Sequence, residues 1–427
     1  MNSRSLEAIF KNVAWLIFDK LFMLGMNMVV IFVIANFYGP EKYGLFQYAV
    51  NIVLMLEIIV QLVDGRVVKK QYFREDHDQI VFNITAAKVL LSSAVLIIGI
   101  VIMLLSDRKG VFSALLFILM VDSIIKNFRF GMENRFEYFL QSKKVVLASN
   151  VGLFVGTLLQ LYAVLNKMSI TYIAVVQTIS TLLSLGILYF QYVQEFKNRS
   201  KGHINRTLIY RIIRESLPLA IASAACVIYT RCDSLMIGIL LSTLEVGIYS
   251  ISSKLISTIQ ILIIPIQTTI FVKMMEWYEE PKRYEENYLR ITSLITWISI
   301  TGILCSFLIL PFVFKMLKPE YLPAIEIYKL MSISTIFTYN AVLRSSHFTI
   351  THNGKILMVT QLITVIMNII LNYILIKLYG MRGAAVATVF SQFVSLFLSN
   401  AFYKEARFVF KNQIKAFNPA YIFKRKH

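Results

Sequence analysis

Charged residues, cysteines and catalytic motifs are all scarce in this chain, and each scarcity excludes a class of protein. Charged residues make up 16% of the 427 residues and hydrophobic residues 57%, which excludes a soluble globular fold and predicts an integral membrane protein. Cys226, Cys232 and Cys305 all lie in apolar runs and are spaced for neither a disulfide framework nor a zinc site. The sequence has no P-loop and no metal-ligand spacing. We therefore expect no cofactor, no metal and no enzymatic activity.

Acidic residues are also few, 24 against 43 basic residues, which gives a net charge of +19. Nucleic-acid binding is not the explanation, because most of the positive charge lies in short loops between apolar runs. Alternate loops, starting from the N-terminus, hold 28 Lys and Arg residues, and the intervening loops hold 8. Cytoplasmic loops of membrane proteins are enriched in these residues, so both termini are predicted to be cytoplasmic.

The apolar runs are long enough for transmembrane helices, which need about 20 residues each. They predict an all-α fold with twelve spans. Their approximate limits are 13–38, 43–64, 80–105, 111–130, 144–165, 170–192, 212–241, 247–272, 289–314, 323–350, 355–378 and 382–403. The fourth is expected to continue as a helix beyond the membrane, and Pro265 is expected to kink the eighth.

The two halves of the sequence resemble each other. Gly44 and Phe46 in the segment FYGPEKYGLFQYAV match Gly247 and Tyr249 in LLSTLEVGIYSIS, and segment 156–178 resembles segment 368–390. This internal repeat predicts two six-helix lobes, and transporters are often built in this way, with the substrate site between the repeats.

We place the lobes at residues 1–200 and 201–427, the second ending in a basic cytoplasmic tail. The segment Gln194–Arg214 is the predicted basic linker between them.

Three charges near the start of the second half are the strongest candidates for a functional site. Arg231 and Asp233 lie within the seventh span, and Lys254 lies about two turns into the eighth. A charge at such a depth costs roughly 2.5–3.5 kcal/mol, and residues two apart on a helix cannot pair. We expect Asp233 to pair with Lys254, or with a cation across a cavity, and Arg231 to face that cavity.

Other charges within the spans are candidates for the same cavity, but each has a structural alternative. Asp122, Lys126 and Arg129 share one helical face, which could also be a self-neutralising stripe. Glu57 and Lys88 could instead form a structural pair.

Arg344 is a further cavity candidate, on one face of the tenth span with Asn340 and His347. His347 titrates near neutral pH in its ordinary state, so it could serve ion coupling or simply be hydrogen-bonded. The complete set of candidates for ion coupling is Asp19, Glu57, Asp122, Asp233 and His347.

Three segments carry a resemblance to a known family. They are KNVAWLIFDKLFMLGMNMVVIFVIANFYGPEKYGLFQYA, IYTRCDSLMIGILLSTLEVGIYSISSKL and NIILNYILIKLYGMRGAAVATVFSQ. Together they resemble the first, the seventh-to-eighth and the eleventh-to-twelfth helix signatures of bacterial polysaccharide flippases of the O-antigen or capsule (Wzx) type. These flippases belong to the multidrug/oligosaccharidyl-lipid/polysaccharide exporter superfamily. The lipid II flippases of this superfamily have two more helices than this chain.

The resemblance implies a function in the bacterial inner membrane. Such proteins move undecaprenyl-pyrophosphate-linked oligosaccharides to the outer leaflet by alternating access, and an ion gradient is the expected drive. The implied partners are the lipid-linked substrate, membrane lipids, and the polymerase and chain-length regulator of the same pathway. A multidrug cation antiporter of the same superfamily and a polysaccharide polymerase are the alternatives. A basic interior suits an anionic lipid headgroup better than a cationic drug.

Overall fold

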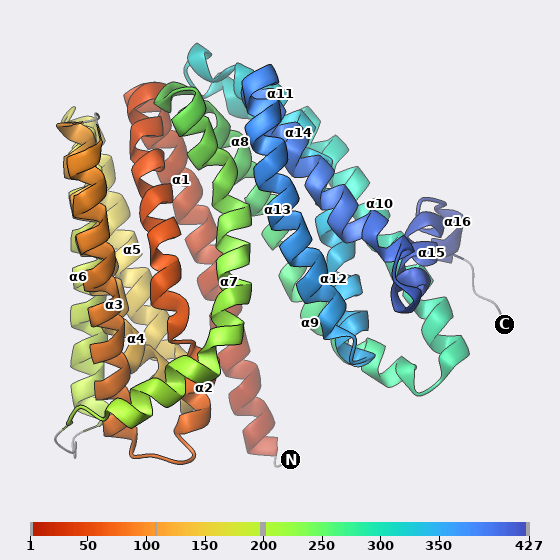
Figure 1. The fold of residues 1–427 in the computed structure, drawn as a ribbon, viewed down its shortest axis with the longest axis horizontal. Helices are drawn as coiled ribbons and strands as arrows, with labels where there is room; N and C mark the ends of the chain where they lie inside the picture. Colours follow the sequence, from red (N-terminus) through yellow and green to blue (C-terminus); the bar gives the residue numbers. More distant parts are fainter. Residues whose placement is uncertain (1–2, 107–108, 197–201, 424–427) are drawn as a thin grey trace. The chain divides into compact units, whose positions relative to one another are not determined.

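The computed structural model describes residues 3–106, 109–196 and 202–423 (Figure 1). The side chains of residues 1–21, 23, 24, 27, 264, 265, 268 and 269 are outside this description. All secondary structure in the described residues is helical. This agrees with the all-α fold that the apolar runs predict.

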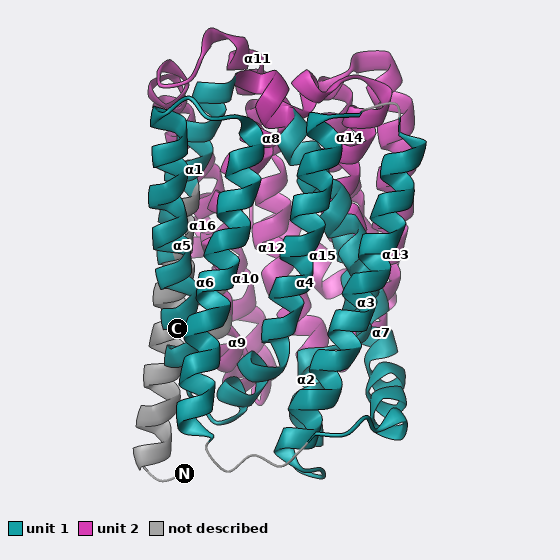
Figure 2. Cartoon of the chain, turned by 90° about the vertical axis from the view of Figure 1, so that its left-hand side faces the viewer, with its two compact units in different colours: residues 1–38, 45–227 teal, residues 39–44, 228–427 magenta. Residues whose placement is uncertain are grey.

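The chain divides into two compact units, shown in Figure 2. Unit 1 comprises Met1–Tyr38 and Leu45–Val227, and unit 2 comprises Gly39–Gly44 and Ile228–His427. These limits come from the packing of the chain, whereas the division at residue 200 rests on the sequence repeat and stays a prediction.

Unit 1 contains most of α1 (Ser3–Leu56) and the first part of α7 (Arg206–Leu240). Between them lie η1 (Glu57–Leu62), α2 (Gly65–Gln71), α3 (His77–Leu105), α4 (Val111–Tyr138), α5 (Ser142–Leu165) and α6 (Ile170–Glu195). Helix α4 runs well past residue 130, as predicted. The helices α5 and α6 approach so closely at Gly152 that a Cβ atom there would lie 2.7 Å from the carbonyl oxygen of Ser180.

Unit 2 begins its helical bundle with the second part of α7. It continues with α8 (Thr243–Ile261), α9 (Ile263–Tyr278), α10 (Pro281–Lys315), η2 (Pro319–Tyr321), α11 (Pro323–Ser332), α12 (Ser334–Ile350) and α13 (Gly354–Tyr379). The last elements are α14 (Met381–Gln392), η3 (Phe393–Phe397), η4 (Leu398–Ala401), η5 (Lys404–Ala406), α15 (Arg407–Lys415) and α16 (Ala420–Phe423).

Nine helices in the described part of the chain are long and apolar enough to cross a membrane. One of them combines the first two predicted spans, because α1 continues through a kink at Gly39, where φ is 74°. The eighth and tenth spans are built from the shorter pairs α8–α9 and α11–α12. Each of the twelve predicted spans thus corresponds to a helix, to part of a long helix, or to a series of shorter helices. The break between α8 and α9 lies at Leu262. Pro265 follows one turn later, and because proline has no backbone N–H it cannot donate the hydrogen bond that would continue the helix.

Candidate functional site

Asp233 lies at the centre of a buried polar cluster in unit 2. Its side chain is on α7 and is only 6% exposed. The carboxylate accepts hydrogen bonds from the Tyr249 hydroxyl on α8 at 2.8 Å and from Asn372 Nδ2 on α13 at 2.7 Å. The hydroxyl of Thr388 on α14 is a third donor. Four helices of unit 2 therefore converge on one carboxylate.

The predicted pairing of Asp233 with a cation is wrong, because all three of these partners are neutral. The geometry of α8 explains this. Tyr249 faces Asp233, and Lys254 is five residues further along, so it lies about 140° around the helix from Tyr249. Neutral donors satisfy the carboxylate without the cost of burying a second charge.

Oxygen atoms without donors lie beside Asp233. Asn368 is one turn before Asn372 on α13, near the Asp233 carboxylate. Among the described residues, neither the side-chain oxygen of Asn368 nor that of Asn372 has a hydrogen-bond partner. A carboxylate with amide and hydroxyl oxygens around it is the type of ligand set that hard cations prefer. No group of three or more His, Cys, Asp or Glu residues that could hold a metal ion occurs in the described chain.

A second candidate site in unit 2 contains two basic residues, Lys254 and Arg231. Lys254 is half-buried on α8, and its Nζ lies 5.7 Å from the centroid of the Tyr43 ring. Arg231 is close enough to repel it electrostatically. No carboxylate among the described side chains lies within ion-pair distance of Lys254. Lys254 therefore contributes positive potential within the spans that an anion would relieve.

Arg344 lies inside the helical packing of unit 2, with only 3% of its surface exposed. Its Nε donates to Asn400 Oδ1 at 2.7 Å and its Nη2 donates to the Thr360 hydroxyl at 2.9 Å. The guanidinium also lies 5.2 Å from the Phe348 ring. This environment favours a structural role for Arg344 over a place on a cavity wall.

Two further residues on the same face of α12 are also buried and hydrogen-bonded. The Tyr284 hydroxyl lies 2.7 Å from His347 Nδ1, and Asn340 Nδ2 donates to the Thr296 hydroxyl at 3.0 Å. The predicted shared face exists, and it packs against neighbouring helices of unit 2. For His347, this geometry favours the hydrogen-bonded alternative over ion coupling.

The charged stripe of unit 1 is neutralised along α4. Lys126 Nζ lies 2.5 Å from Asp122 Oδ2, and Arg129 lies 2.8 Å from Glu133. Gln177 also donates to Asp122, at 3.1 Å. The sequence left a self-neutralising stripe as the alternative to a cavity wall, and these pairs favour that alternative.

Lys88 and Glu57 do not form a contact ion pair, so that structural alternative is wrong. Lys88 Nζ donates to the Val60 carbonyl at 2.8 Å and lies 4.1 Å from the centroid of the Phe130 ring. Val60 lies near the end of the 3₁₀ helix η1, where the last carbonyls have fewer partners within the helix. Glu57 still acts on Lys88 electrostatically. The side chain of Asp19 lies outside the described residues.

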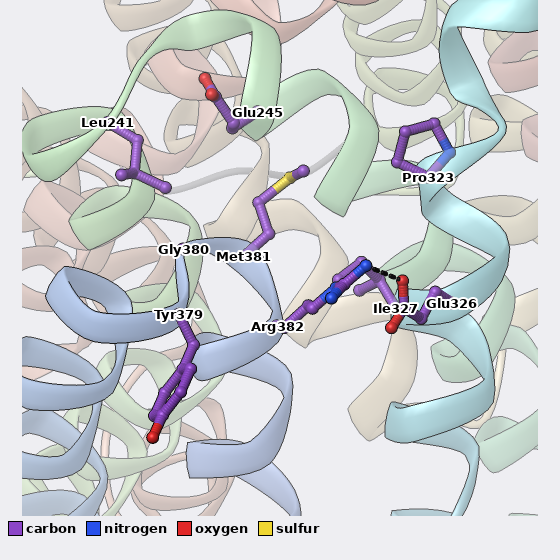
Figure 3. A pocket seen from close by; sticks show the side chains of 9 residues that line it. All are labelled: Leu241, Glu245, Pro323, Glu326, Ile327, Tyr379, Gly380, Met381 and Arg382. Carbon is purple, nitrogen blue, oxygen red and sulfur yellow. Dashed lines mark ion pairs between the residues drawn. The ribbon is translucent and has the colours of Figure 1, made fainter.

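A cavity of about 380 Å³ lies where helices of unit 2 end (Figure 3). It is lined by the turn between α13 and α14, by Leu241 just after α7, and by residues of α8 and α11. Arg382 lies 2.6 Å from Glu326 on its wall, and both side chains are at least half exposed. The sequence gave no reason to expect this pair.

A family model described as "Polysaccharide biosynthesis protein" matches residues 9–275. The chain belongs to this polysaccharide biosynthesis protein family. No curated protein matches its sequence. The resemblance found in the three segments is thus confirmed at the level of the family.

Solved structures share the fold of this family member at low identity. An inward-facing multidrug resistance MATE transporter of the MOP superfamily is 14% identical, with a TM-score of 0.72, and the match covers 93% of this chain and 96% of that chain. The lipid II flippase MurJ is also 14% identical, with a TM-score of 0.73 and coverage of 95% and 90%. A MOP superfamily transporter from Pyrococcus furiosus is 16% identical, with a TM-score of 0.56 and 97% coverage of both chains. The chain is a multi-pass membrane protein with this transporter fold.

The sequence of this family member pointed to Asp233 but not to most of its partners. Tyr249 entered only as the repeat counterpart of Phe46, and Thr388 was not singled out. Asn368 and Asn372 both lie in the third segment that carries the family resemblance. Two amides one turn apart on an apolar helix were a signal for a polar partner, since each must find one inside the membrane.

Proposed function

We propose that the protein is a flippase that moves undecaprenyl-pyrophosphate-linked oligosaccharides from the inner to the outer leaflet by alternating access. Family membership and the transporter fold support this proposal. The observation that carries it is the positive charge at Lys254 and Arg231. The carboxylate of Asp233 accepts from neutral donors and does not pair with Lys254. A diphosphate brings the negative charge and the acceptor oxygens that Lys and Arg bind.

Substrate binding is the role we assign to Lys254 and Arg231. The two side chains repel each other when the site holds no anion. A diphosphate between them would replace this repulsion with two attractive contacts. The bidentate guanidinium would orient the phosphates, and the ammonium would act as a point charge.

Ion coupling is the role we assign to Asp233. A proton or a monovalent cation on its carboxylate would change the hydrogen bonds that join α7, α8, α13 and α14. The side-chain oxygens of Asn368 and Asn372 are further acceptors for a cation. An ion that binds one packing of these four helices better than another shifts the equilibrium between the two.

A multidrug cation antiporter is the second candidate, because MATE transporters share this fold to a similar degree. A site that contains Lys254, with Arg231 within electrostatic reach, repels a cationic drug, so we favour the anionic substrate. Polymerase activity is a third and weaker candidate. In this proposal the polymerase and the chain-length regulator are separate partners, and the protein is a transporter of the bacterial inner membrane.

Deletion of the gene tests the proposal in a strain that has no second flippase. Lipid-linked repeat units should accumulate on the cytoplasmic leaflet, and the surface polysaccharide should disappear. Sensitivity to cationic drugs should stay unchanged. Normal surface polymer with increased drug sensitivity would instead identify the antiporter.

A further inference from the structure

The C-terminal helix α15 lies alongside the last span of unit 2. Gln413 Nε2 donates to the Leu396 carbonyl at 3.1 Å, and Asn400 Nδ2 donates to Gln413 Oε1 at 3.0 Å. The Phe408 ring stacks on His347, with ring centroids 5.0 Å apart. The helix therefore folds back against the end of the span.

One face of α15 is buried and the opposite face is cationic. Val409, Asn412, Gln413 and Ala416 are buried. The opposite face presents Arg407, Lys411, Ile414 and Lys415, which are all exposed. These four positions follow the i, i+4, i+7, i+8 spacing of a single helical face. We call them, with Lys404 just before the helix, the cationic face.

The cationic face lacks compensating charge. None of its four basic side chains has an ion-pair partner among the side chains that the structure describes. Glu405 is the one acidic residue between positions 402 and 417.

The corner between α9 and α10 in the same unit differs in this respect. There Lys273 pairs with Glu276 at 2.9 Å and Arg283 pairs with Glu280 at 3.2 Å. Four basic residues between positions 273 and 290 are balanced by five acidic ones. The excess positive charge is therefore a property of α15 and not of the whole end of the unit.

Large apolar side chains surround the cationic face. Phe402 is 76% exposed, Ile414 50% and Phe417 45%. An interfacial helix typically combines basic residues, which bind anionic headgroups, with aromatic and aliphatic residues, which enter the acyl boundary. An acidic protein surface would pair with the charges but would gain little from phenylalanines placed around them.

We propose that the cationic face of α15 binds anionic phospholipid headgroups and docks the C-terminal segment of the chain on the membrane surface. Each Lys or Arg near an anionic surface changes the ratio of docked to undocked protein by about fivefold. Four such residues make docking depend strongly on the lipid composition and on the salt concentration.

The test uses a spin label at Ile414→Cys in the full-length protein, with the exposed Cys226 and Cys305 replaced by alanine. The protein is placed in nanodiscs of phosphatidylcholine with or without phosphatidylglycerol. We expect the label to be accessible to oxygen and shielded from a water-soluble nickel chelate only when phosphatidylglycerol is present. High salt should expose it to the chelate again.

Two variants separate docking from folding. Replacing Lys404, Arg407, Lys411 and Lys415 by glutamine should expose the label even with phosphatidylglycerol, whereas Lys404→Arg, Lys411→Arg and Lys415→Arg together should keep it shielded. The matched control replaces exposed lysines of the opposite loops, Lys42, Lys109, Lys167 and Lys315, by glutamine and should leave the label shielded. A label that is equally open to the chelate in both lipid compositions overturns the proposal. So does a glutamine variant that behaves like the control.

Discussion

The Tyr249 hydroxyl donates to the Asp233 carboxylate at 2.8 Å and so joins α8 to α7 inside unit 2. The repeat-related position in the first half of the chain is Phe46, which has no hydroxyl. The two halves thus share an aromatic residue after a glycine, but at this position only the second half has a hydroxyl. The proposed ion coupling at Asp233 therefore uses a contact that the repeat does not duplicate.

Asp233→Asn is predicted to abolish ion-driven transport and to leave the folded protein intact. The amide keeps one acceptor for the neutral donors, but it cannot take up a proton in this pH range and has no negative charge to attract a cation. Proteoliposome transport with and without an ion gradient is the measurement, beside the melting temperature in detergent. Tyr249→Phe is the comparison, because it removes one hydrogen bond and keeps the carboxylate, at a cost of about 1 kcal/mol of stability.

The two variants should therefore have different defects. Asp233→Asn should lose the response to the gradient, and Tyr249→Phe should keep that response with a lower melting temperature. A gradient response that survives Asp233→Asn would remove Asp233 from the coupling mechanism.

The sequence predicted the helices far better than the partners of their charged residues. Hydropathy is a sum over about 20 residues, so the twelve spans could be found even where α8–α9 and α11–α12 are broken. Which residues a charged side chain contacts depends on the rotation of each helix about its axis. The error at Asp233 arose because depth was estimated for Lys254 but its direction around α8 was not. Asp122 and Lys126 were predictable, because residues four apart on one helix need no tertiary information.

Arg231→Ala and Lys254→Ala are each predicted to abolish transport while the protein still reaches the membrane. Lys254 is repelled by Arg231 and forms no ion pair with a described side chain, so removing its charge should not lower stability. Arg231→Lys should recover only part of the activity, because a point charge replaces a bidentate fork. Membrane abundance by immunoblot is measured beside surface polymer. Reduced abundance of both alanine variants would indicate a structural lock between helices.

The topology prediction concerns the two ends of the chain. The bias of 28 to 8 basic residues between alternate loops predicts that both ends are in the cytoplasm. A reporter that is active only in the periplasm should stay silent when it is fused after Lys404. The same reporter inserted at the loop near Lys167 should be active. Activity after Lys404 would require an odd number of spans and would contradict the two six-helix lobes.

Arg344→Ala is predicted to lower the amount of folded protein, whereas Lys254→Ala is predicted to leave it unchanged. Its guanidinium is held by Asn400 and Thr360 within the packing of unit 2, so Arg344→Ala leaves these buried groups without a donor. Each buried polar group left unpaired costs roughly 1–3 kcal/mol, and the variant should therefore lower the amount of folded protein. Arg344→Met fills similar volume without a charge and should restore part of the abundance, since a buried charge can often be replaced by a packed apolar side chain. Transport per folded molecule, measured in proteoliposomes, should stay near that of the unaltered protein for Arg344→Met. If Arg344→Met instead folds normally and does not transport, Arg344 contacts the substrate and belongs with Lys254 and Arg231.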